Sequence, residues 1–592
     1  MKKLISTLMV ILFALNAFSQ ADSIRINQVG YYTKGPKMAI VTGITSPSDF
    51  YVIGVAKNDT LFSGKTGPLM KSKNSSITTS AADFTSLQQA GKYFLNVPSL
   101  GLSYPFEIGS NALSPLAVSS LKGFYYIRSA MQLDAKYAGK WARPAGHPDT
   151  AVLIHPSAAT SARPVGTIIS TPGGWYDAGD YNKYIVNSGI TTGTLLSAYE
   201  DYPEYFKTLK TNIPPIAGVP DLLNEILYNL RWMLTMQDPN DGGVYNKCTN
   251  ADFDGMVMPG ETKLPRYVVQ KGTAATLDFA AVAAQASRIF SAYKKQLPGL
   301  SDSCLKAAIA AWNWAQKNPA LEYNQTSINR MNYKPAITTG GYGDKNFLDE
   351  WVWASAELYI TTKDENYYKL ITKNINSPLR LPSWGDVFAL GFYSLLRNEK
   401  NIPSTHAGDI TTIKNDIMDM ANNFIKAPLS NAFHTVMGKD VSDFNWGSNS
   451  NAANQGILLL QAYNLTKNRA FLDAALSNAD YIAGRNATGF CFVTGIGSKS
   501  TMDPHHRPSV ADGIAEPVPG LLAGGPNPGR QDKCEYKFFE PETCYVDASC
   551  SYASNEIAIN WNAPLVYLVN GIEALQFDAG YSEKPMPTPK KK

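Results

Sequence analysis

The chain has 592 residues and a formal net charge of +4, with 53 lysines and arginines against 49 aspartates and glutamates. Charged residues make up 17%, below the roughly 25% of an average soluble protein, whereas aromatic residues reach 11% and apolar residues 44%. These values exclude disorder for most of the chain, and they argue against a basic nucleic-acid-binding protein or one held on a membrane by charge.

Residues 1–20 have the pattern of a secretory signal peptide. Lys2 and Lys3 precede a short apolar run from Leu8 to Leu15, and small residues lie at the −3 and −1 positions of a cleavage site after Ser19. The run is too short to span a bilayer. We therefore expect a secreted protein, extracellular or periplasmic, with no membrane span.

Residues 21–109 contain short runs rich in β-forming residues, separated by turn formers such as Gly35-Pro36 and Asn58-Asp59. The clearest runs are 24–26, 38–41, 50–53 and 93–97. Runs of this length without a helical period predict a small β-sandwich.

Residues 110–578 show helical periodicity instead. Twelve helices are expected, at 114–131, 187–201, 220–237, 273–293, 302–318, 347–361, 365–374, 384–397, 411–426, 448–466, 469–483 and 555–576. With almost no strand signal between them, they predict a mainly α fold, a two-layer helical barrel. Long irregular stretches at 132–186, 238–272 and 484–554 are where we expect the chemistry, and 579–592 is predicted to be a disordered tail.

Two carboxylates, Asp177 and Asp180, lie in a glycine- and aromatic-rich loop just before a predicted helix. A neighbouring like charge or apolar surroundings can raise a carboxyl pKa and make the group a usable base. Capping of the following helix is the structural alternative. Glu556 likewise lies at the start of a predicted helix, where a capping-box glutamate is the alternative to a catalytic acid.

A third polar cluster spans Asp503 to Arg507 and holds His505 and His506, two of only six histidines. These residues supply too few ligands for a metal site, so hydrogen bonding to substrate is the better interpretation. The six cysteines all lie between Cys248 and Cys550. Disulfides and buried thiols both fit them, and the absence of any C-x-x-C pair argues against zinc.

Three motifs carry a resemblance to a known family. They are Asp177-Ala178-Gly179-Asp180, the segment 499–507 ending in His505-x-Arg507, and a third motif made of Tyr545, Asp547, Tyr552, Glu556, Ala558, Asn562 and Ala563. Together they resemble glycoside hydrolase family nine, with one departure at Cys491, where Ser, Thr or Val is usual. Residues 24–31 resemble the start of the immunoglobulin-like module that precedes the catalytic domain in one branch of that family.

The resemblance implies an (α/α)6 barrel that cleaves β-1,4-glucosidic bonds with inversion and needs no cofactor for its chemistry. It implies Asp180 as the general base, Asp177 as a holder of the attacking water and Glu556 as the general acid. His505 and Arg507 would bind sugar hydroxyls, with His506 beside them, and Asp547 would support the acid or its loop.

Aromatic side chains near these motifs are candidates for stacking on sugar rings, namely Trp175, Tyr176, Trp446 and Tyr552. Calcium is common in the family, and a glycine-rich segment at 339–344 precedes hard oxygen donors at Asp349, Glu350 and Asp386. Helix capping and solvated charge are the alternative there.

We therefore expect a monomeric endo-β-1,4-glucanase acting on cellulose or a related β-glucan. An exo-acting cellobiohydrolase or β-glucosidase, or a mixed-linkage or xyloglucan hydrolase, keeps the same mechanism and is the main alternative. A non-catalytic polysaccharide-binding protein is a weaker one, because all the residues of the three motifs are present.

Overall fold

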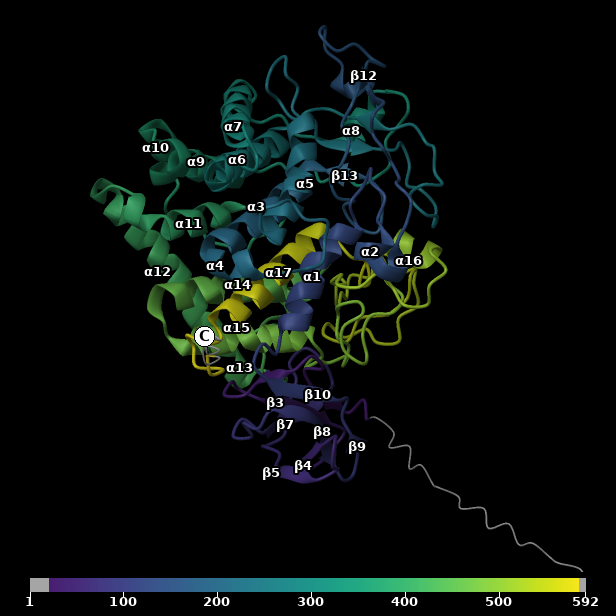
Figure 1. Cartoon of the computed structure of the whole chain (residues 1–592), viewed down its shortest axis with the longest axis vertical. Coiled ribbons are helices and arrows are strands. Elements are labelled where there is room, and N and C mark those ends of the chain that lie inside the picture. The colour runs from purple at the N-terminus through teal and green to yellow at the C-terminus, as the bar shows by residue number, and fades with distance from the viewer. Residues whose placement is uncertain (1–20, 585–592) are drawn as a thin grey trace, which may run out of the picture.

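The computed structural model describes residues 21–584 (Figure 1). The predicted signal peptide at 1–20 and the last eight residues of the predicted tail lie outside this range. Within it, no helix is both long and apolar enough to cross a membrane.

The amino-terminal part is the predicted sandwich, drawn in purple in Figure 1. One sheet has the order β1 (Ile24–Arg25), β3 (Met38–Thr42), β7 (Thr78–Asp83), β6 (Met70–Lys71). The other has the order β2 (Tyr31–Tyr32), β10 (Phe106–Gly109), β8 (Gly91–Val97), β4 (Asp49–Gly54), β5 (Thr60–Lys65), with β9 (Gly101–Leu102) paired to β8. Alternate residues of β4 and β8, such as Phe50, Val52 and Leu95, point into a shared apolar core.

Twelve helices of the described chain form the predicted (α/α)6 barrel. The inner layer consists of α3 (Ile185–Asp201), α6 (Thr273–Phe290), α9 (Leu348–Thr362), α11 (Phe388–Arg397), α14 (Ser448–Thr466) and α17 (Ile559–Leu575). The outer layer consists of α1 (Ser114–Tyr126), α5 (Asp221–Thr235), α7 (Leu300–Lys317), α10 (Glu365–Lys373), α12 (Ala407–Phe424) and α15 (Arg469–Ile482). Five short helices lie in the connections: α2 (Ala135–Ala138), α4 (Pro203–Thr208), α8 (Gln325–Arg330), α13 (Ala427–Ser430) and α16 (Arg507–Ala511).

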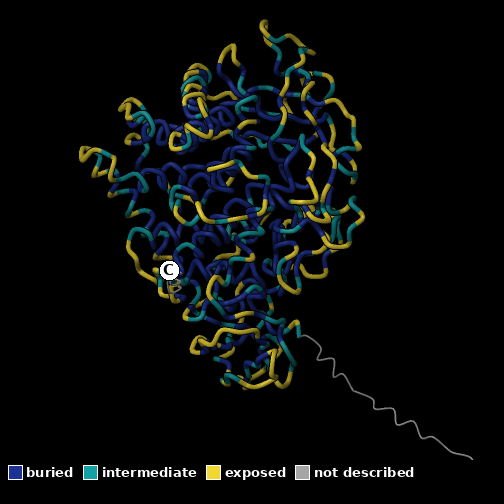
Figure 2. Tube along the Cα trace, in the orientation of Figure 1, coloured by how far each residue is buried: buried dark blue, intermediate teal, exposed yellow. Residues whose placement is uncertain are grey.

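Burial patterns separate the two layers. Every residue of α3 from Ile185 to Tyr199 is buried, whereas α12 buries one stripe, Ile410, Ile413, Ile417, Ala421 and Phe424. A helix that is apolar on one face covers a core, and one buried on all sides lies inside it. Figure 2 shows the same contrast between the dark interior and the exposed rim.

The connections predicted to be irregular contain a small sheet, which corrects that expectation. Its order is β12 (Ile168–Ile169), β11 (Val152–Ile154), β15 (Tyr267–Val268), β14 (Lys247–Thr249), β13 (Lys183–Tyr184). Strands of two or three residues are too short to show a period of two in the sequence. The pairing of β13 with β14 places Tyr184 opposite Lys247 beside the site described below.

The predicted tail begins too early, because residues 579–584 pack on the fold. Tyr581 is buried, stacks on Tyr32 with ring centroids 5.5 Å apart, and donates to Asp473 Oδ1 at 2.6 Å. The sandwich itself is held on the barrel by Asn27 Nδ2, which donates to Asp480 Oδ1 in α15 at 2.7 Å.

Candidate active site

Asp177 lies in the loop that precedes β13 and α3. The N-cap of α3 is Tyr184, so neither aspartate caps this helix. The carboxylate of Asp177 is buried and accepts hydrogen bonds from Asn187 Nδ2 at 2.7 Å and from the Tyr342 hydroxyl at 2.8 Å. Burial and the negative charge of Asp180 raise the pKa of Asp177 to about 8.

Asp180 is the second carboxylate of this loop and is also buried. Its Oδ2 accepts from Asn182 Nδ2 at 2.6 Å and from the Tyr184 hydroxyl at 3.0 Å. Since both bonds reach the same oxygen, Oδ1 is the one that the described side chains leave available to a water molecule.

Glu556 lies beside the same loop. The backbone of Glu556 forms an isolated β-bridge with that of His505. Glu556 precedes α17, whose N-cap is Ala558. The prediction of a helix from 555 is therefore wrong at this end, and Glu556 does not cap it. The Gly179 amide donates to Glu556 Oε1 at 3.2 Å. Burial, followed by the charge of Asp180, raises the pKa of Glu556 well above its ordinary value.

Gly179 allows this close approach because it has no side chain. A Cβ at this position would lie 2.2 Å from the His505 carbonyl oxygen and 3.1 Å from Glu556 Oε1. Any larger residue would push apart the two segments that carry the carboxylates.

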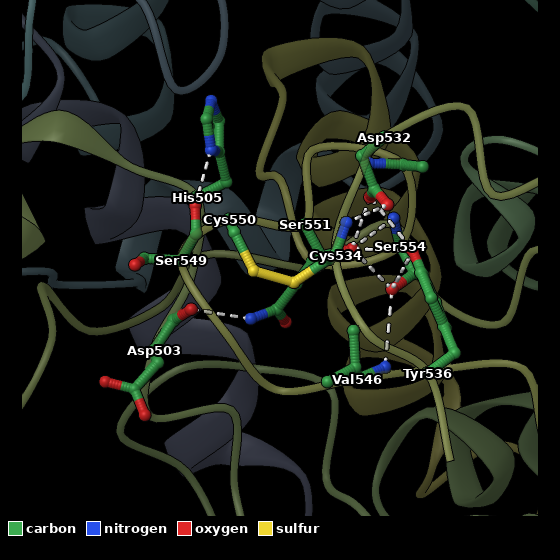
Figure 3. The surroundings of a disulfide bond; sticks show 12 residues. Asp503, His505, Asp532, Cys534, Tyr536, Val546, Ser549, Cys550, Ser551 and Ser554 are labelled. Carbon is green, nitrogen blue, oxygen red and sulfur yellow. Dashed lines mark hydrogen bonds between the residues drawn. A yellow bond between two sulfur atoms is a disulfide. The ribbon is translucent and has the colours of Figure 1, made fainter. Parts of the chain in front are cut away.

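His505 is oriented by the loop that contains the disulfide Cys534–Cys550 (Figure 3). Its Nδ1 lies 2.7 Å from the carbonyl oxygen of Ser549, the residue before Cys550. A carbonyl only accepts, so Nδ1 carries the proton, and Nε2 is left as an acceptor in the neutral ring. Burial lowers the pKa of His505 and so favours that neutral form.

His506 and Arg507, which are predicted to bind sugar, are both largely buried, and their contact with substrate stays a prediction. His506 Nδ1 lies 2.9 Å from Ser509 Oγ. Arg507 Nη1 donates to the Gly179 carbonyl at 2.7 Å, and its Nε donates to the Asp254 carbonyl at 2.9 Å. Arg507 thus links the start of α16 to the loop of Asp177 and Asp180.

Asp547 also acts through its neighbours. It accepts from the amides of Met502 and Asp503 at 2.8 and 2.9 Å and from Asn555 Nδ2 at 3.0 Å. It thereby fixes the segment before His505 and the residue before Glu556. Its role as a support of the acid or of its loop stays a prediction, and these contacts favour it.

The aromatic candidates divide into two groups. Trp175 and Tyr176 are 0% and 2% exposed, and their polar atoms bond Glu225 and His147, so the prediction that they stack on sugar is wrong. Trp446 and Tyr552 are 44% and 36% exposed, and their ring centroids lie 5.7 Å apart. Tyr552 also lies 5.9 Å from the His505 ring, which puts this pair beside the site.

Sequence reasoning missed other residues of the site. Trp384 is 36% exposed and contacts the Tyr342 ring edge-on at 5.3 Å, which places an open aromatic face near Asp177. Tyr184 and Asn187 follow Asp180 by four and seven positions, and an asparagine that is buried at the start of α3 was the signal available. Tyr342 lies in the glycine-rich segment 339–344, whose sequence indicates only a calcium site.

The calcium candidates gather with two further carboxylates, Asp278 and Asp344. Buried oxygens without a hydrogen-bond partner occur on Asp278, Asp344, Asp349 and Glu350. Burial and mutual repulsion raise the pKa values of Asp278 and Glu350 well above the ordinary range, and burial raises that of Asp386. Across residues 21–584 no group of three or more His, Cys, Asp or Glu side chains is assembled as a metal site. The all-oxygen donor set nevertheless suits a hard cation such as Ca²⁺.

A barrel mouth with three convergent carboxyl groups is the site of a glycoside hydrolase. The profile of glycosyl hydrolase family 9 matches residues 114–569, and that of the cellulase N-terminal ig-like domain matches residues 19–101. The chain belongs to glycosyl hydrolase family 9.

Curated relatives and solved structures of this family match almost the whole length of the chain. The chain is 47% identical to the xyloglucan-specific endo-beta-1,4-glucanase BoGH9A of Bacteroides ovatus, over 95% of each chain. It is 32% identical to endoglucanase D of Acetivibrio thermocellus, over 93% of this chain and 84% of that protein. The solved structure of Bacteroides ovatus GH9 superposes with a TM-score of 0.89 at 46% identity, covering 94% of this chain and 99% of that one. The predicted family, fold and enzyme class are therefore confirmed.

Proposed function

We propose that the protein is an inverting endo-β-1,4-glucanase whose substrate is xyloglucan. The observation that carries the mechanism is the hydrogen bond from the Gly179 amide to Glu556 Oε1. It brings the segment of Asp177 and Asp180 against Glu556, whose raised pKa suits a general acid.

In this mechanism Asp180 is the general base. Asp177, held by Asn187 and Tyr342, orients the attacking water together with Asp180. Glu556, kept protonated by burial, transfers its proton to the leaving glycosidic oxygen. Inversion places acid and base on opposite faces of the sugar with room for a water between them. The neutral Nε2 of His505 accepts a hydrogen bond from a sugar hydroxyl in the cleavage subsite.

The substrate assignment rests on two observations. The chain is 47% identical to BoGH9A over 95% of each chain, and the site has exposed aromatic faces. Trp446 and Tyr552 present one stacking surface and Trp384 another. Unbranched cellulose is the second candidate, supported by the similarity to endoglucanase D. A branched glucan and an unbranched one share the bond that is cleaved and differ in the side groups that the cleft must admit.

The test is hydrolysis of xyloglucan, carboxymethylcellulose and mixed-linkage glucan, with products sized over time. The proposal predicts fastest cleavage of xyloglucan, early products of mixed size, and the α-anomer as the first-formed sugar by proton NMR. A single small product would show exo action, and a first-formed β-anomer would exclude inversion. Asp180→Asn protein from the same preparation controls for contaminating glucanases.

Export as a monomer and a structural calcium complete the proposal. The pattern of residues 1–20 supports export. Asp349, Glu350 and Asp386, together with Asp278 and Asp344, would hold the calcium, because buried oxygens of Asp278, Asp344, Asp349 and Glu350 lack hydrogen-bond partners. The sandwich is assigned to 21–109 and the catalytic domain to the barrel from residue 110, extended past 578 to include Tyr581.

A further inference from the structure

Lys247 is a fully buried lysine beside the site that has no carboxylate partner. Its Nζ donates to Gln325 Oε1 at 2.6 Å, to Thr339 Oγ1 at 2.9 Å and to the Gly340 carbonyl at 2.6 Å. All three acceptors are uncharged. Burying an ammonium group without a counter-ion costs several kcal/mol unless another interaction compensates.

The other buried lysines of the described barrel are paired. Lys183 Nζ lies 2.7 Å from Asp149 Oδ2, and Lys271 Nζ lies 2.7 Å from Asp238 Oδ2. No ion pair within 4.0 Å involves Lys247 in residues 21–584. The compensating charge for Lys247 therefore lies further away.

That charge is Asp180, to which the Tyr184 hydroxyl donates. The ammonium lies 5.4 Å from the ring centroid of Tyr184, its partner across β13 and β14. The Tyr184 oxygen accepts from the Gly340 amide at 3.1 Å, so its own proton is free to go to Asp180 Oδ2 at 3.0 Å. Lys247 holds Gly340 by its carbonyl and thus fixes the donor that orients the Tyr184 hydroxyl.

The other titratable groups near Asp180 are Asp177, Glu556, His505 and Arg507. Asp177 lies in the same loop and Glu556 lies across the site, and the charge of Asp180 raises the pKa of both. His505 is held neutral by burial, and Arg507 faces Glu556. Burial lowers the pKa of Lys247 to about 7, and the charge of Asp180 opposes this change. Lys247 is therefore the cation that faces Asp180.

We propose that Lys247 is a positioning residue for the general base: through Gly340 it holds the Tyr184 hydroxyl on Asp180, and its ammonium supplies positive charge to that side of the site. This inference rests on the proposed function, in which Asp180 must be ionised to act. Lys247 lies on β14, a strand too short to be predicted from the sequence.

The test compares pH–activity profiles of the full-length enzyme carrying Lys247→Met, Lys247→Arg and Lys271→Met. We expect Lys247→Met to move the acidic limb of kcat to higher pH by on the order of 0.5–1 unit and to lower kcat about tenfold at acidic pH, with KM nearly unchanged. Lys247→Arg should keep the wild-type limb. Lys271→Met, which loses another buried lysine that is paired with carboxylates, should lower the melting temperature and leave the acidic limb of the pH profile in place.

An unshifted acidic limb in Lys247→Met, or the same shift in Lys271→Met, would overturn the inference. If Lys247→Met does not fold, the pH–activity profile of Tyr184→Phe is measured instead, because this variant removes the hydroxyl that Lys247 is proposed to orient. A wild-type limb in Tyr184→Phe would also overturn the inference. Full activity in Asp180→Asn would instead refute the proposed function, so the two failures are distinguishable.

Discussion

The amide of Gly179 donates to the carboxyl of Glu556 across 377 residues of sequence. Gly179 lies between two aspartates, and Glu556 lies just ahead of the last helix of the barrel. The two segments are further joined by the Ile559 amide, which donates to the Asp177 carbonyl at 2.9 Å. The catalytic carboxyls are therefore held by backbone bonds that do not depend on substrate.

The raised pKa of Glu556 predicts that activity and stability both fall as the pH rises. The protonated form is the active acid, so activity is lost as the pH rises through this pKa. The folded-state pKa lies above its ordinary value of 4.5, so the folded state binds more protons than the unfolded chain above about pH 4.5. The unfolding free energy therefore falls as the pH rises from that value toward the raised pKa. Glu556→Gln, which cannot ionise, should gain in melting temperature over wild type at pH 8 but not at pH 4.5. Melting curves at the two pH values measure this, and equal differences at both would contradict it.

Trp446 should contribute to substrate binding and not to the chemical step. Trp446→Ala removes a stacking surface that is worth roughly 0.5–1.5 kcal/mol, so KM for oligosaccharides should rise about three- to tenfold with kcat nearly unchanged. Trp446→Phe should restore most of the loss. Steady-state kinetics on a defined oligosaccharide measure this effect. An unchanged KM in Trp446→Ala would exclude Trp446 as a stacking surface for the substrate.

The carboxyl cluster around Asp278 should make stability depend on calcium. Calcium at about 100 times its dissociation constant would add about 2.7 kcal/mol to the unfolding free energy. The melting temperature should therefore fall after treatment with EDTA and recover with CaCl₂. Glu350→Gln, which removes one negative charge from the cluster, should reduce the difference. Identical melting temperatures of the wild type in EDTA and CaCl₂ would contradict the calcium proposal.

The disulfide Cys534–Cys550 should support both stability and the site. It closes a loop with a sequence separation of 16 residues, and a loop of that size corresponds to about 3 kcal/mol. The paired variant Cys534→Ser/Cys550→Ser should lose about that much unfolding free energy and bind substrate more weakly, because Ser549 orients His505. Urea unfolding and KM measure the two effects. Cys304→Ala, at a buried free cysteine, is the control and should leave KM unchanged. An unchanged KM in the paired variant would contradict the proposal that the disulfide supports substrate binding.

The barrel could be predicted from the sequence because its helices are long and periodic. The helix expected at 448–466 has those bounds in the structure, and most others agree within a few residues. The carboxylates could be predicted because each lies in a motif. Neither pattern depends on knowing which segments meet in space.

The rest of the site depends on contacts that leave no local signal. Trp175 and Trp446 both lie beside loop glycines, yet one is buried against Glu225 and the other is open to solvent. Lys247 and Tyr184 meet through strands of three and two residues. Asp278 lies in an alanine-rich helix, where nothing marks it as part of a carboxyl cluster until α6 packs against α9.

The most direct test of the central assignment uses a substrate whose leaving group needs no proton, a 2,4-dinitrophenyl β-cello-oligosaccharide. If Glu556 is the general acid, Glu556→Gln should lose on the order of 10²–10⁴-fold in kcat on xyloglucan but keep most of its activity on the activated substrate. If Asp180 is the general base, Asp180→Asn should be inactive on both. Equal losses of Glu556→Gln on the two substrates, or activity of Asp180→Asn on either, would contradict the assignment.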